Sequence, residues 1–157
     1  MSRATLAEDI ARSVAGDPWH GAGLQTLLAD VGDAEAAAHP IAGAHSIAEL
    51  VLHVAAWMDE VARRLDGARP AEPAAGDWPP LVAWPEARAR LAAAHARLQR
   101  ALADFPESRL AERLGGERDA PLGSGVSFAV MLAGVAAHNA CHGGQVALLR
   151  RALRPPA

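Results

Sequence analysis

Apolar residues recur at every third or fourth position in four parts of the chain, which is the pattern of helices that bury one face. The first part is interrupted, because one apolar run covers residues 6–14 and a second covers residues 24–31. Asp17 and Pro18 lie between the two runs and predict an N-cap followed by proline at the first helical position. The chain should therefore begin with a broken helix.

The second helix is predicted from Ser46 to about Leu65. Ser46 and Glu49 have the spacing of a capping box, in which each side chain accepts a hydrogen bond from the backbone N–H of the other. The polar connection before it, residues 32–44, ends in a stretch whose proline and glycine speak against a continuing helix. His53 falls on the edge of the apolar stripe of this second helix and not on its solvent face.

A stretch rich in proline and glycine, residues 66–80, separates the second helix from the third and should be a loop. A connection of this length suits either a crossover along the bundle or a lid over one end. Pro85 predicts the first position of the third helix, because proline is common there. The predicted inward positions of that helix include Trp84, Leu91, Leu98 and Phe105.

The final helix should start after Ser127, a candidate N-cap, and run to about residue 149. Its inward positions, taken every third and then fourth residue, form the seam of a helix packed in a bundle. They are Phe128, Met131, Val135, His138, His142, Gln145 and Leu149. Such a seam is normally apolar throughout, so two histidines and a glutamine on it need an explanation.

Four helical segments joined by short and medium links predict an all-α fold, an up-down four-helix bundle with a long loop between the second and third helices. The chain has 157 residues, of which 51% are hydrophobic and 21% are charged. This length and composition suit a single helical domain over residues 1–157.

Charge and cysteine content argue against several classes of partner. The formal net charge is −3 and the arginines are spread along the helices, so nucleic acid is not an expected partner. No apolar run approaches the length of a membrane span, and Glu8 and Asp9 lie where a signal peptide would need apolar residues. Cys141 is the only cysteine and is expected to be a small buried residue. We therefore expect a cytoplasmic protein without a membrane partner.

His138 and His142 are four residues apart, so they project from one face of the final helix about one turn apart. A buried imidazole without partners costs about 1–3 kcal/mol for each unsatisfied group, so something must occupy the ring nitrogens. A divalent metal ion is one explanation, and a carbonyl group or a water molecule on each histidine is the other. His53 supplies a third imidazole, and a shared ion requires its ring within about 8 Å of the other two.

Three neutral imidazoles would leave a coordination position open, as in catalytic rather than structural metal sites. A metalloprotease is not expected, because Asn139 stands where the H-E-x-x-H motif has the glutamate that acts as general base. The candidate catalytic residues are Gln145 and Glu60. Gln145 could hydrogen-bond a metal ligand or make a polar contact between helices. Glu60 could take a proton or be surface charge.

Four stretches of sequence carry a resemblance to a known family. They are WHGAGLQTLLADV near the start, HPIAGAHSIAELVLHVAAW around His53, DWPP in the long loop and GVAAHNACHGGQVALLRRAL at the end. With its three histidines, the chain resembles the DinB-like (YfiT-like) family of metal-binding four-helix bundles. Relatives often have aspartate and tyrosine where this chain has Asn139 and Cys141, so no role of a carboxylate or a phenol beside the site is carried over.

The resemblance implies that His53, His138 and His142 hold one divalent ion, nickel or zinc. Related members use the ion to activate a low-molecular-weight thiol for transfer or isomerisation, and homodimers are common among them. We therefore expect a homodimeric, metal-dependent transferase that binds a small-molecule substrate and a small thiol. The alternative is a non-catalytic, stress-associated protein in which the ion only ties two helices together.

Overall fold

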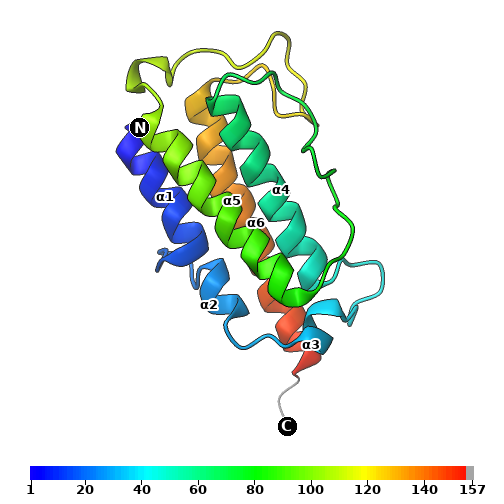
Figure 1. Cartoon of the computed structure of the whole chain (residues 1–157). Helices are drawn as coiled ribbons and strands as arrows, with labels where there is room; N and C mark the ends of the chain where they lie inside the picture. The colour runs from blue at the N-terminus through cyan, green and yellow to red at the C-terminus, as the bar shows by residue number, and fades with distance from the viewer. Residues whose placement is uncertain (155–157) are drawn as a thin grey trace.

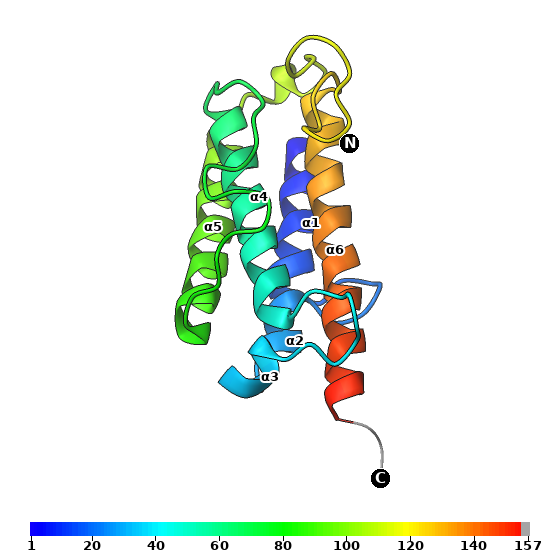
Figure 2. The ribbon, with the colours of Figure 1, turned by 90° about the vertical axis from the view of Figure 1, so that its right-hand side faces the viewer.

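Four long helices lie side by side and carry most of the core (Figures 1 and 2). The computed structural model describes residues 1–154. The long helices are α1 (Arg3–Ala15), α4 (Ile47–Leu65), α5 (Trp84–Asp104) and α6 (Phe128–Leu153). The short elements are α2 (Leu24–Leu28), α3 (Asp33–Ala37) and a 3-10 turn at Glu107–Arg109. Residues 1–154 contain no β-strand beyond isolated bridges, so the predicted all-α fold is confirmed.

The directions of the long helices differ from the predicted up-down order. α1 and α6 run one way, and α4 and α5 both run the other way, as Figures 1 and 2 show. The carboxylate of Asp59 on α4 and the guanidinium of Arg97 on α5 are 3.6 Å apart. Both residues lie in the second half of their helices, as expected for two neighbouring helices that run in the same direction. Residues 66–83 cross back along α4 before α5 begins (Figure 1), and we refer to this segment as the crossover. Parallel neighbours need such a crossover because the chain must return to the end where the first helix began.

Local capping explains where two of the long helices begin. Ser46 Oγ accepts a hydrogen bond from the backbone N–H of Glu49 at 3.2 Å, and the Glu49 carboxylate accepts one from the Ser46 N–H at 2.6 Å. Ser127 Oγ accepts a hydrogen bond from the first turn of α6 in the same way. Both predicted caps are therefore confirmed. The predicted cap at Asp17 is wrong, because α2 begins only after Gly23.

The core lies where the apolar stripes of the four long helices meet. The predicted inward residues of α5 are buried, including Trp84, whose indole N–H donates to the carbonyl of Val31 at 2.8 Å. At the other end of the bundle, where α6 begins, the rings of Phe105 and Phe128 pack with their centroids 4.8 Å apart. None of the helices in residues 1–154 combines the length and the apolar character needed to cross a membrane.

Candidate metal centre

Three histidines from two helices lie together between α4 and α6. His53 lies on α4 and is buried, whereas His138 and His142 lie on α6 and are half-buried. Nε2 of His138 is 3.0 Å from Nε2 of His53 and 3.1 Å from Nε2 of His142. The ring centroid of His53 is 5.0 and 4.8 Å from the centroids of the other two rings. This is well inside the limit of about 8 Å that a shared ion requires.

The histidines of α6 lie at the edge of its buried face and not at its centre. The most deeply buried positions of this part of the helix are Asn139 and Val146, which are completely covered. Gln145, predicted to point inward, is exposed. α6 is apolar on nearly all sides, so helical spacing alone could not show which of its faces is covered by the other helices.

Hydrogen bonds on the far side of two rings decide which nitrogen carries the proton. Nδ1 of His53 is 2.7 Å from the carbonyl oxygen of Asp77, which can only accept, so this Nδ1 carries the hydrogen. Nδ1 of His142 donates to Oε1 of Gln145 at 2.7 Å in the same way. In the neutral rings, Nε2 of both residues is then left with a lone pair beside Nε2 of His138.

This set of nitrogen donors fits a divalent transition metal. Two nitrogens that each bind one ion at about 2.0–2.1 Å can be at most about 4.2 Å apart. Both Nε2 pairs that include His138 meet this limit at 3.0 and 3.1 Å, and the third pair, within 4.8 Å, needs to close by at most about 0.6 Å to share an ion. A single proton on His138 can satisfy only one of the two lone pairs beside it, whereas one shared cation can accept all three donors.

Burial keeps two of the rings neutral at ordinary pH. Burial, with repulsion from His142 and His53 as smaller causes, lowers the pKa of His138 to about 4. Burial also lowers the pKa of His142. Because metal ions bind the neutral imidazole, these two side chains can act as ligands without first losing a proton.

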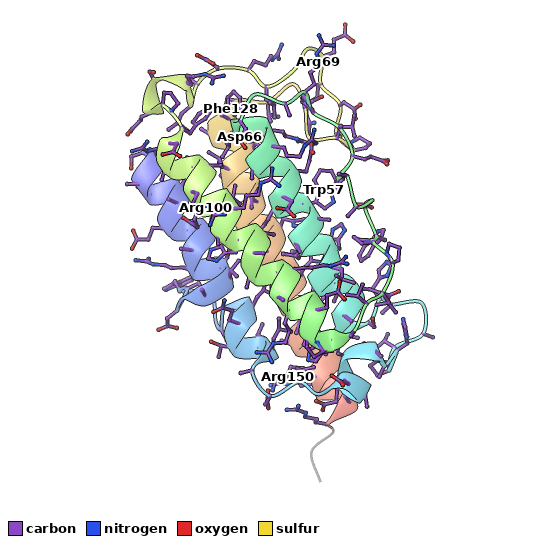
Figure 3. All side chains as sticks on the ribbon, viewed as in Figure 1. Trp57, Asp66, Arg69, Arg100, Phe128 and Arg150 are labelled. Atoms are coloured by element: carbon purple, nitrogen blue, oxygen red, sulfur yellow. The ribbon has the colours of Figure 1, made fainter. Side chains whose placement is uncertain are left out.

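The crossover contributes two residues to the site that sequence reasoning missed. Besides its carbonyl contact with His53, Asp77 accepts a hydrogen bond at Oδ1 from the indole N–H of Trp57 at 2.6 Å. Trp57 projects from α4 toward the crossover (Figure 3). The Trp78 ring stacks between His45 and His53, with ring centroids 3.5 and 4.2 Å away. The DWPP stretch was a signal for these residues, but spacing along the chain could not show that the crossover returns beside His53.

The two candidate catalytic residues have different surroundings. Gln145 is exposed and holds the His142 ring through its hydrogen bond to Nδ1, so it contacts a candidate metal ligand and not another helix. Glu60 is not surface charge, because its side chain is completely buried. Its carboxylate accepts hydrogen bonds from two arginines of α4, including Arg64, and from the backbone N–H of Ala71 at 3.1 Å. These bonds tie α4 to the start of the crossover.

A cavity of about 500 Å³ adjoins the histidines. α4, α6 and residues 118–126 of the loop before α6 form most of its wall, and that wall is largely apolar. His53 and His138 line the cavity, together with Asn139, whose Nδ2 donates to Ser13 Oγ at 3.1 Å. A small molecule in the cavity could therefore contact two of the three histidines.

Comparisons with known proteins identify the family. The family model of the DinB superfamily matches residues 19–146, a range that includes the three histidines, Asp77 and the whole wall of the cavity. Comparisons with curated proteins and with solved structures found no match. Because the family match covers more than half of the chain and every residue of the candidate site, this protein belongs to the DinB superfamily.

Proposed function

We propose that the protein binds one divalent ion, nickel or zinc, through His53, His138 and His142 and acts as a metal-dependent transferase on a small thiol. The proposal rests on Nε2 of His138, which lies 3.0 Å from Nε2 of His53 and 3.1 Å from Nε2 of His142, while other groups occupy Nδ1 of the latter two rings. The adjoining cavity favours a catalytic role, because a largely apolar cavity with a few polar groups is the usual form of a small-molecule site.

The side chains of the site have separate tasks in this proposal. Three imidazoles leave at least one position of a four-coordinate ion open. When bound, the ion supplies positive charge that favours the deprotonated form of a thiol or of water. The Asp77 carbonyl and Gln145 hold two of the rings in place, and the Trp78 ring covers His53. The largely apolar wall of the cavity offers a contact surface for the apolar part of a substrate beside the histidines.

Turnover of a small thiol with an electrophile tests the catalytic role. In the reaction with monochlorobimane, the thiol sulfur forms a bond to carbon, chloride leaves, and the thiol proton goes to the solvent. With cysteine or glutathione and protein loaded with nickel or zinc, we expect a rate about 100-fold above that of His53→Ala protein. His20→Ala is the control and should react like the unaltered protein, since His20 is exposed and lies outside the three-histidine site.

A different outcome would favour the non-catalytic, stress-associated alternative. In that case the ion raises the melting temperature, chelation lowers it, and none of the thiols tested turns over. This alternative is supported by the positions of the three histidines. One lies on α4 and two lie on α6, so a bound ion would link two helices that are far apart in the sequence.

We also propose that two copies of the chain associate through the outward face of α6. Residues 128–149 of this helix contain no aspartate, glutamate, lysine or arginine. The outward face is exposed and consists of Val130, Gly134, Ala137, Cys141, Gly144 and Leu148, so the expectation that Cys141 is buried is wrong for the single chain. Exposed helix faces normally carry charge, and a second copy would cover this one.

Ala137→Glu is expected to convert the homodimer into a monomer, because a glutamate inside an apolar interface would be buried without a partner. Light scattering after size-exclusion chromatography measures the mass. Ala92→Glu is the control, since Ala92 is exposed on α5, and it should leave the mass unchanged. A monomeric mass for the unaltered protein at every concentration tested would contradict the proposed dimer.

A further inference from the structure

The wall of the cavity beside the histidines includes two arginines. Arg64 and Arg118 line it together with the apolar residues. Arg64 lies three turns beyond His53 on α4, and its Nε reaches back to Glu60. Since Glu60 is seven residues after His53, the guanidinium lies about 10 Å along the helix axis from the histidine. The two ends of the cavity therefore present different chemistry to a ligand.

Arg64 is buried, yet only part of its guanidinium is paired. The residue is 2% exposed. Its Nε donates to Glu60 and its Nη2 donates to the carbonyl of Ala71, each at 2.9 Å. Its Nη1 makes no hydrogen bond with any group in residues 1–154, and it lies close to Gly123, where an added Cβ would be 3.6 Å from it. Because this Nη1 has no acceptor within the protein, it is free to donate to an anionic ligand in this corner of the cavity.

Asn139, which also lines the cavity, has an unpaired polar atom that lies behind the cavity wall. Its side chain is completely buried, and its Nδ2 donates to Ser13. Its Oδ1 has no hydrogen-bond donor among the groups of residues 1–154. This oxygen is covered by the protein itself, so a ligand in the cavity would not meet it without a movement of the Asn139 side chain.

We propose that the cavity binds a small organic carboxylate with an apolar body. The carboxylate meets Arg64 and Arg118, the body packs against apolar side chains such as Val61 and Met131, and the opposite end reaches the histidines. The acidic residue in the wall, Asp77, lies beside His53, so it favours the same orientation by repelling the carboxylate. The inference rests on the proposed function, because it names the class of substrate that would reach the ion.

Octanoate and its uncharged analogue octanamide are the probes for this proposal. Calorimetric titration into protein kept free of metal with a chelator is expected to show octanoate binding about tenfold tighter or more, because a charge-assisted hydrogen bond is stronger than a neutral one. The double variant Glu60→Gln with Arg64→Gln removes the buried pair as a unit, and it should lose most of the preference for octanoate and keep only the part that Arg118 supplies.

Two glycines of α6 provide a matched pair of variants that leave the buried ion pair intact. A Cβ added at Gly134 or at Gly144 meets nothing within 4 Å, and both residues lie on the outward face of the helix. Only Gly134 lines the cavity. Both substitutions alter the face proposed for the dimer, but only Gly134→Leu adds a side chain at the wall of the cavity, so it should weaken octanoate binding about tenfold or more relative to Gly144→Leu.

Equal affinities for octanoate and octanamide, equal effects of the two leucine substitutions, or no measurable binding would each overturn the proposal. If the double variant does not fold, the proposal is still tested by the affinities of the unaltered protein for octanoate and octanamide, and by the octanoate affinities of the two leucine variants. Binding that appears only after nickel or zinc is added would also overturn it, because the ion and not Arg64 would then hold the carboxylate. Failure of the protein to bind metal leaves the expected octanoate affinity unchanged, so the two proposals can fail separately.

Discussion

Replacing His53 with alanine is expected to abolish tight metal binding while the helices stay folded. His138 and His142 would remain as two ligands on one helix, and the ligand from α4 would be lost. Structural zinc sites with four ligands bind with about 10–16 kcal/mol, so one ligand contributes on the order of 3 kcal/mol, and its loss weakens binding by about two orders of magnitude. The fold should survive, because the His53 ring lines the cavity and is not enclosed on all sides by the core.

Elemental analysis of protein purified without an affinity tag measures this effect. We expect about one ion per chain in the unaltered protein and fewer than about 0.2 in the His53→Ala protein. His95→Ala is the control, since His95 is half-buried on α5 and lies outside the three-histidine site. An unaltered protein with fewer than about 0.2 ions per chain, or a metal content that the substitution does not change, would refute the proposed centre.

Glu60→Ala is expected to lower the free energy of unfolding by about 3–5 kcal/mol. Arg64 would keep its charge in a buried position without a counter-charge, and the N–H of Ala71 would lose its acceptor. Domains of this size are stable by about 5–15 kcal/mol, so the loss would be a large share of the total. Urea unfolding followed by circular dichroism measures the change.

Glu86→Ala on α5 is the matched control for this experiment. Glu86 and Arg90 have the same four-residue spacing, but their side chains are 52% and 45% exposed. Loss of an exposed pair should cost about 0.5 kcal/mol or less. Replacing Glu60 with leucine and Arg64 with methionine together should recover most of the loss, since no charge is then buried alone. If Glu60→Ala and Glu86→Ala lower the free energy of unfolding by similar amounts, burial does not strengthen the Glu60–Arg64 ion pair in solution.

Most of the helical framework could be predicted from rules that act within one or two turns. The caps at Ser46 and Ser127 use side chains three residues from their partners, and apolar spacing marks which residues of α4 and α5 face inward. His138 and His142 stood out for the same local reason, because four-residue spacing places them on one face. His53 stood out because a polar ring lies beside an apolar stripe.

The sequence by itself thus determined the helices, most of their ends and the three histidines that the fold brings together. The tertiary structure decided that α4 and α5 run parallel, that Asp77 and Trp78 of the crossover lie against His53, and that Glu60 is buried. The physical reason is that helical periodicity specifies which side of each helix is covered but not which segment covers it. That choice depends on contacts between residues far apart in the chain, and here it depends on the path of the crossover along α4.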